Sequence, residues 1–114
     1  MNGVKAQPLK IANSGGYAPC EVSDASHVCL NLPGPIPTRI VPVQIKGTRK
    51  GTGNWTWNGS MRSPTLRPSV LTKHPQPDGT LVCHSWITDG KVQFLADCSH
   101  ELAGQTLDLF DVDW

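Results

Sequence analysis

The sequence lacks long apolar runs, an apolar leader and any excess of one charge, and each absence excludes a class of protein. No segment approaches the roughly 20 apolar residues of a membrane-spanning helix, and the first 16 residues hold no secretory signal. We therefore expect a protein that is made and kept in a reducing cytoplasm. A net charge of +1 gives no reason to expect a nucleic acid as partner.

Aromatic residues make up only 6% of the 114 residues, whereas Gly (11) and Pro (10) are abundant. Both residues destabilise helices, so the composition favours short strands joined by turns. We predict an all-β fold, a small single-domain sheet or sandwich over residues 17–114, preceded by a weakly structured arm over residues 1–16. Residues 39–46 alternate in polarity, and Pro42 would place that strand at a sheet edge or a bulge.

The clearest expected element is a β-hairpin near the C-terminal end. Residues 81–87 and 91–96 flank Asp89-Gly90, a pair favoured in two-residue type I′ turns. In that register, one face carries Leu81, Cys83, Ser85, Ile87, Val92, Phe94, Ala96, Cys98 and, if the strand continues, His100. The opposite face carries His84, Trp86, Gln93, Leu95 and Asp97.

Cys83, Cys98 and His100 on one face would supply three of the four ligands of a tetrahedral zinc ion. Four cysteines in a reducing compartment indicate metal binding or buried thiols before disulfides. We predict a structural Zn²⁺ site, which stabilises the fold, with Cys20 as the fourth ligand. The alternative ligands are His27, Cys29 and His84. Buried apolar thiols, a disulfide, or a His100 that only caps a turn are the competing interpretations.

A catalytic site has less support in the sequence. Ser85, His84 and Asp97 could form a triad, but Ser85 faces away from the other two. Asp97 and Glu101 flank the Cys/His cluster, where a carboxylate could act as a base on metal-bound water or simply hold a ligand in place. No phosphate loop, dinucleotide motif or HExxH is present. We therefore predict that the chain is not an enzyme and assign no catalytic residue.

The tryptophans are expected to be structural first. Trp55 and Trp57 share a strand face and would cover a small core, and Trp86 would pack on the far side of the hairpin. An exposed tryptophan patch would instead mark an interface. The interface candidates are therefore Trp55, Trp57, Trp86 and Trp114, the last either docked on a neighbouring subunit or frayed.

Two segments, WTWNGSMRSPTLRPSVL (55–71) and CHSWITDGKVQFLADCSHELAGQTLDL (83–109), resemble a family of short bacteriophage and prophage proteins of unknown function. Some members carry the automatic label "ammonia monooxygenase", which does not suit a chain without a membrane span. The resemblance implies a phage origin and a small Cys/His domain. It also implies an N-terminal C-x-x-C pair followed by His: Cys20 and His27 match, whereas Ser23 replaces the second Cys.

From these observations we predict a non-catalytic phage structural protein with a structural zinc site, which stabilises or decorates the capsid. Its partners would be phage structural proteins or further copies of itself in an oligomeric assembly, with no membrane and no nucleic acid. It would reside in the host cytoplasm during infection, with the virion as a second location. The alternatives are a zinc-binding phage regulatory or host-interaction protein and, below that, a metal-dependent enzyme.

Overall fold

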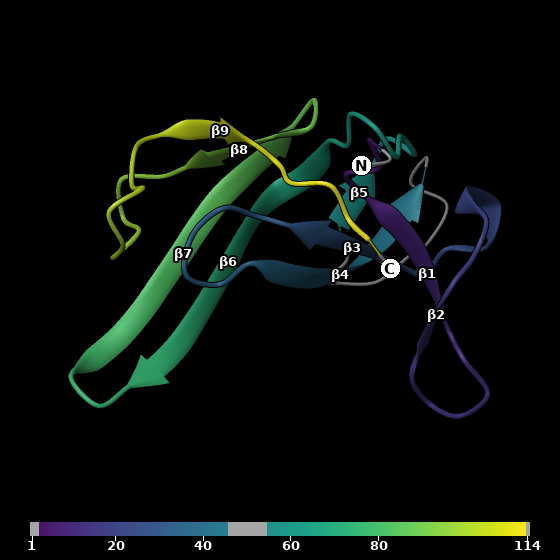
Figure 1. Cartoon of the computed structure of the whole chain (residues 1–114), viewed down its shortest axis with the longest axis horizontal. Helices are drawn as coiled ribbons and strands as arrows, with labels where there is room; N and C mark the ends of the chain where they lie inside the picture. Colours follow the sequence, from purple (N-terminus) through teal and green to yellow (C-terminus); the bar gives the residue numbers. More distant parts are fainter. Residues whose placement is uncertain (1–2, 46–54, 114) are drawn as a thin grey trace.

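The computed structural model describes residues 3–45 and 55–113, and it confirms the all-β prediction (Figure 1). The strands are β1 (Gln7–Ile11), β2 (Tyr17–Pro19), β3 (His27–Asn31), β4 (Thr38–Ile45), β5 (Trp55–Trp57), β6 (Leu66–Gln76), β7 (Gly79–Thr88), β8 (Lys91–Phe94) and β9 (Thr106–Asp108). Within the described ranges, the helical structure is a single 3-10 turn over Val22–Asp24. No helix in this part of the chain has the length and hydropathy needed to cross a membrane.

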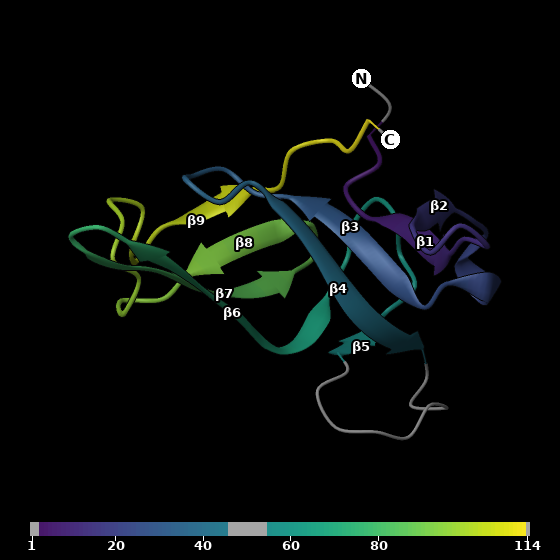
Figure 2. The ribbon, with the colours of Figure 1, turned by 90° about the horizontal axis from the view of Figure 1, so that it is seen from below.

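The strands form one sheet in the order β2-β1-β3-β4-β5-β6-β7-β8-β9. Neighbours are antiparallel except β4 and β5, which run parallel. The sheet curls so that β3 and β4 lie across β6, β7 and β8 (Figure 2). Each half of the sheet therefore covers one face of the other.

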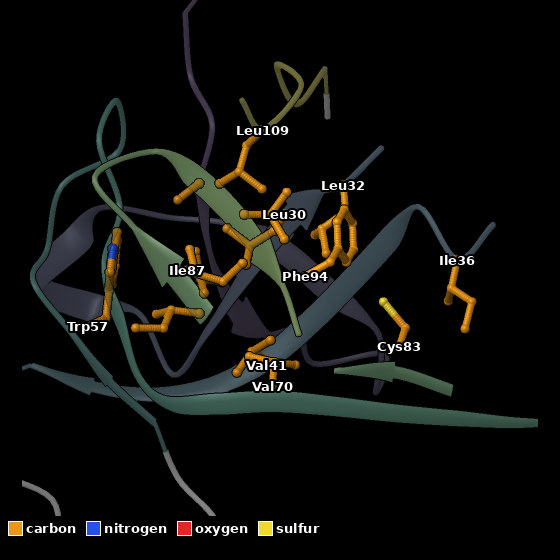
Figure 3. Close-up of a cluster of buried hydrophobic side chains, with 14 of the residues drawn as sticks. Leu30, Leu32, Ile36, Val41, Trp57, Val70, Cys83, Ile87, Phe94 and Leu109 are labelled. Carbon is orange, nitrogen blue, oxygen red and sulfur yellow. The ribbon is translucent and has the colours of Figure 1, made fainter. Parts of the chain in front are cut away.

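The core lies between these two halves of the sheet. Leu30 and Val41 come from one half, and Val70, Ile87 and Phe94 from the other, and all are buried (Figure 3). Burying an aliphatic or aromatic side chain of this size stabilises a fold by about 1.5–3 kcal/mol each. The side chains on the inward faces of β6 and β7 are thus buried in the core, whereas those on the outward faces remain accessible.

The predicted hairpin is confirmed in place and register. Its cross-strand pairs are Ser85 with Phe94, Trp86 with Gln93, Ile87 with Val92, and Thr88 with Lys91. Asp89 and Gly90 adopt φ of 50° and 78°, as a type I′ turn requires. β8 ends at Phe94, earlier than expected, because the chain turns back and the Cys98 N–H donates to the Leu95 carbonyl at 3.1 Å.

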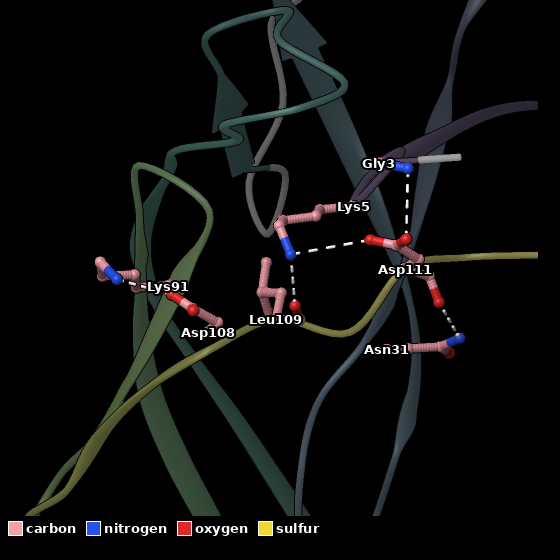
Figure 4. Close-up of polar contacts among 7 residues, drawn as sticks. All are labelled: Gly3, Lys5, Asn31, Lys91, Asp108, Leu109 and Asp111. Carbon is pink, nitrogen blue, oxygen red and sulfur yellow. Dashed lines mark hydrogen bonds and ion pairs between the residues drawn. The ribbon is translucent and has the colours of Figure 1, made fainter. Parts of the chain in front are cut away.

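Residues 7–11, which the sequence placed in a weakly structured arm, form β1 between β2 and β3. The Leu9 side chain on this strand is fully buried. Just before it, the Lys5 Nζ donates to the Leu109 carbonyl at 2.7 Å and lies 3.7 Å from the Asp111 carboxylate (Figure 4). The Asn31 amide donates to the Asp111 carbonyl at 3.3 Å. The N-terminal region is therefore an integral part of the sheet.

β4 lies inside the sheet, and the expectation that Pro42 marks an edge strand was wrong. β3 pairs with Thr38 to Pro42, and β5 pairs with Val43 to Ile45. Pro42 is therefore the last β4 residue that pairs with β3 and lies just before the first one that pairs with β5. At this position the missing N–H removes no hydrogen bond from either pairing.

Candidate active site

The pairing of β6 with β7 contains an irregularity that displaces one serine. Leu66 faces Ile87 and Val70 faces Ser85, so three residues of β6 lie opposite the single residue Trp86. Extra residues of this kind bend a strand and redirect a side chain. Pro68 is suited to such a segment because it has no N–H to contribute to the ladder. Ser69, the last of the three residues, is half-buried at this bulge.

At the bulge, three side chains form a continuous chain of hydrogen bonds. Ser69 Oγ lies 2.8 Å from His84 Nε2, and His84 Nδ1 lies 2.9 Å from Asp97 Oδ2 and 3.2 Å from its Oδ1. A carboxylate only accepts, so the Nδ1–H of a neutral imidazole donates to Asp97. That tautomer leaves Nε2 free to accept from the Ser69 hydroxyl.

The three residues come from neighbouring parts of one meander and share its outward face. His84 lies on β7, between the buried Cys83 and Ser85, and its side chain is 23% exposed. Asp97 follows β8 and is more open, with 60% of its side chain exposed. Ser85 is buried in the core at 1% exposure, so it faces away from His84, as the register predicts.

Polar contacts hold the bulge around Ser69. The Trp55 indole N–H donates to the Ser69 carbonyl at 3.1 Å. Arg67 donates through Nη1 to the Leu66 and Ile87 carbonyls at 2.7 and 3.0 Å, and its guanidinium lies 5.0 Å from the centre of the Trp86 ring. These contacts fix the backbone on both sides of Pro68.

A shallow groove of about 280 Å³ opens beside the bulge. It is lined by Arg67, Trp86, Thr88 and Gln93.

The predicted metal ligands lie in two regions. Cys83 and Cys98 are both buried, and the Arg39 guanidinium is the cation that acts on Cys83. Burial raises the pKa of the Cys83 thiol, and burial followed by Arg39 lowers the pKa of His100. A cation thus lies beside both groups. Among the described residues, no three His, Cys, Asp or Glu side chains are grouped to hold a metal ion, and zinc stays a prediction.

The remaining candidate ligands lie near the other end of the sheet. Cys29 is buried on β3 and packs with Leu9 and Val112. The His27 ring packs edge-on against Tyr17, with centroids 5.1 Å apart, and Cys20 is half-buried just after β2. In the first region, the His100 ring packs edge-on against the Phe94 ring, with centroids 4.8 Å apart.

The tryptophans occupy different environments. Trp57 is buried at 1% exposure, and its indole N–H donates to the Ser60 carbonyl at 3.1 Å. Trp55 and Trp86 are half-buried and lie on either side of the Ser69 bulge. Trp114, the fourth interface candidate, lies outside the described residues.

A hydroxyl, an imidazole and a carboxylate hydrogen-bonded in this order are the arrangement found in serine hydrolases. The chain belongs to the BubE family, described as a bacterial ubiquitination-like system serine protease, whose family model matches residues 20–95. That range includes Ser69 and His84 and ends two residues before Asp97. Searches against curated proteins and against solved structures found no match.

This family membership corrects the functional expectations drawn from the sequence. The prediction of a non-catalytic, capsid-associated phage protein was wrong, because the matching family is described as a protease. The prediction that the chain is not an enzyme was wrong for the same reason. The family that matches is BubE and not a phage family, so the expected phage origin gains no support from this match.

The contact between His84 and Ser69 was not predicted. The sequence offered only Ser85 as a serine partner for His84 and correctly set it aside because it faces the other way. The usable signal was the outward position of His84 and Asp97, which calls for a nucleophile on the strand that pairs with residues 81–87. Pro68 before Ser69 marks the irregularity that presents the hydroxyl.

Proposed function

We propose that the chain is a serine protease that cuts a polypeptide of a bacterial ubiquitination-like system, with Ser69 as its nucleophile. The observation that carries this proposal is the 2.8 Å contact between Ser69 Oγ and His84 Nε2, continued by His84 to Asp97. The description of the family supports the same reaction.

Each residue of the triad has a defined step. His84 Nε2 takes the hydroxyl proton as Ser69 Oγ attacks the scissile carbonyl carbon, and Asp97 stabilises the imidazolium that forms. The imidazolium then gives the proton to the leaving amine, and the C–N bond breaks. A water molecule, deprotonated in turn by His84, hydrolyses the ester on Ser69 and restores the enzyme.

The test is covalent labelling with a fluorophosphonate, which reacts with activated serines. We expect one label per chain, located at Ser69 by peptide mass spectrometry, and no label on the Ser69→Ala variant. Ser23→Ala, which removes an exposed serine remote from the triad, is the matched control and should label like the wild type. A folded wild-type chain that takes no label, or a Ser69→Ala variant that still does, would overturn the assignment.

A further inference from the structure

Beyond Arg67, β6 has a neighbouring strand on one side only. β7 pairs with β6 as far as the turn after Gln76, whereas β5 pairs only with Leu66 and Arg67. Within residues 3–45 and 55–113, no other strand pairs with β6, and the hairpin of β6 and β7 projects from the rest of the sheet (Figure 1). An open strand edge therefore begins beside Ser69.

The turn between β6 and β7 identifies which backbone groups this edge presents. Gln76 and Gly79 face each other across a two-residue turn, so they form a hydrogen-bonded pair, and the pair type alternates along an antiparallel ladder. Leu71 and Lys73 fall at the positions that do not bond to β7. Their N–H and C=O groups point outward, and no backbone bond in the described part of the chain uses them.

Two residues limit the length of this edge. At its near end, the Trp55 indole already bonds to the outward carbonyl of Ser69. At its far end, Pro75 occupies the next outward position and has no N–H to offer. The open stretch therefore consists of Leu71 and Lys73, with two N–H donors and two carbonyl acceptors. That number suits a short extended peptide.

The side chains along this stretch indicate what kind of peptide it would take. Leu71 is opposite His84 in the register and is 49% exposed, so it offers apolar surface beside the open edge. Lys73 is exposed, and no carboxylate in the described part of the chain pairs with it. An apolar contact and an acidic partner would complement these two side chains.

We propose that an extended segment of the substrate adds to β6 as a short strand along Leu71 and Lys73, with an acidic side chain beside Lys73. This addition of a strand would supply backbone hydrogen bonds and bring the scissile bond to Ser69. The inference rests on the proposed protease function, since it places the substrate relative to that nucleophile. It favours extended segments, because only an extended backbone can pair with a strand edge.

The test removes one outward N–H without touching the ladder to β7. Lys73→Pro loses the N–H and the charge, whereas Lys73→Ala, the matched control, loses only the charge. Proline should fold at this position because Pro75 already occupies the equivalent outward position two residues away. The melting temperature of each variant checks that expectation.

The substrate probe is a library of peptides from a digested bacterial proteome, with cleavage followed by mass spectrometry. We expect kcat/KM of Lys73→Pro to fall on the order of tenfold below that of Lys73→Ala, because a hydrogen bond is lost and a ring blocks the added strand. Lys73→Ala should in turn lose preference for acidic peptides. Fluorophosphonate labelling of Ser69 should be unchanged in both variants.

These readouts separate the two proposals. Failure of the wild type to label at Ser69 would remove the protease function itself. Normal labelling with equal kcat/KM in the two Lys73 variants, or with no peptide of the library cleaved, would overturn the docking edge alone. A wild-type dimer that Lys73→Pro converts to a monomer, without a change in cleavage, would instead assign the edge to a second copy of this chain.

Discussion

The thiol of Cys98 makes two hydrogen bonds to the backbone of His84. It accepts from the His84 N–H at 3.2 Å and donates to the His84 carbonyl at 3.0 Å. The preceding residue, Asp97, contacts the imidazole of the same histidine. One short turn after β8 therefore holds both the backbone and the ring of His84.

Replacing Cys98 with alanine should lower both stability and turnover. The variant leaves the half-buried N–H of His84 without a partner, which costs about 1–3 kcal/mol, whereas the His84 carbonyl keeps the Leu95 N–H at 2.9 Å. Cys98→Ser keeps a donor and acceptor and should retain most of the kcat, as measured by peptide hydrolysis and urea unfolding. Equal kcat in the two variants would contradict a positioning role. The bound zinc content of both proteins, measured in parallel, tests the metal prediction separately.

Replacing Asp97 with asparagine should lower kcat by roughly 10²–10⁴ and change KM little. The amide can donate to Nδ1, which would move the imidazole proton to Nε2 and remove the acceptor for Ser69. Because Asp97 is exposed, the free energy of unfolding should stay near the wild-type value. The control is Asp108→Asn, an exposed carboxylate that pairs with Lys91 and lies outside the triad. A changed KM with an unchanged kcat would contradict the role given to Asp97.

Replacing Gly90 with alanine should destabilise the hairpin by about 1–3 kcal/mol. Gly90 has φ of +78°, and a Cβ there would lie 3.2 Å from the Arg62 carbonyl oxygen. Gly104 has a similar φ of +82° with no atom within 4 Å of an added Cβ, so Gly104→Ala measures the backbone strain alone. Urea unfolding should show the larger loss for Gly90→Ala. A larger loss for Gly104→Ala would show that the contact between the added Cβ and the Arg62 carbonyl does not destabilise the hairpin.

His100 should make the fold less stable as the pH falls below about 6.5. Burial, and after it the Arg39 guanidinium, lowers the pKa of His100 from its ordinary value of 6.5 in the folded chain, although Glu101 opposes them. The unfolded chain therefore takes up this proton first, and the resulting loss is absent above the unfolded pKa. Urea unfolding at two pH values should show a smaller acid loss for His100→Gln than for the wild type. An identical loss would show that other titratable groups cause it.

The sequence predicted the hairpin because its determinants are local. Asp89-Gly90 requires a particular turn, and that turn sets the register of every pair from Thr88 to Phe94. The faces of His84 and Ser85 follow from the alternation of a strand. The placement of β1 was missed because its burial depends on β3 and on the C-terminal segment, which are distant in sequence.

The contact between Ser69 and His84 was missed for a physical reason. Ser69 meets His84 only because β6 gains extra residues between Leu66 and Val70, and regular alternation does not predict where a strand slips. The function was mispredicted for a related reason. Residues that meet only through strand pairing leave no sequence motif, so the absence of known motifs was weak evidence against an enzyme.

The whole triad lies within one unbroken meander, from Ser69 on β6 to Asp97 just after β8. Many hydrolases gather such residues from distant loops, so exchanging one loop between two of them breaks the site. Here a single graft of residues 66–98 would carry Ser69, His84 and Asp97 together, along with the open edge at Lys73. Chimaeras between members of this family should therefore inherit their cleavage preference from this segment, provided that the core residues of β3 and β4 still pack against it.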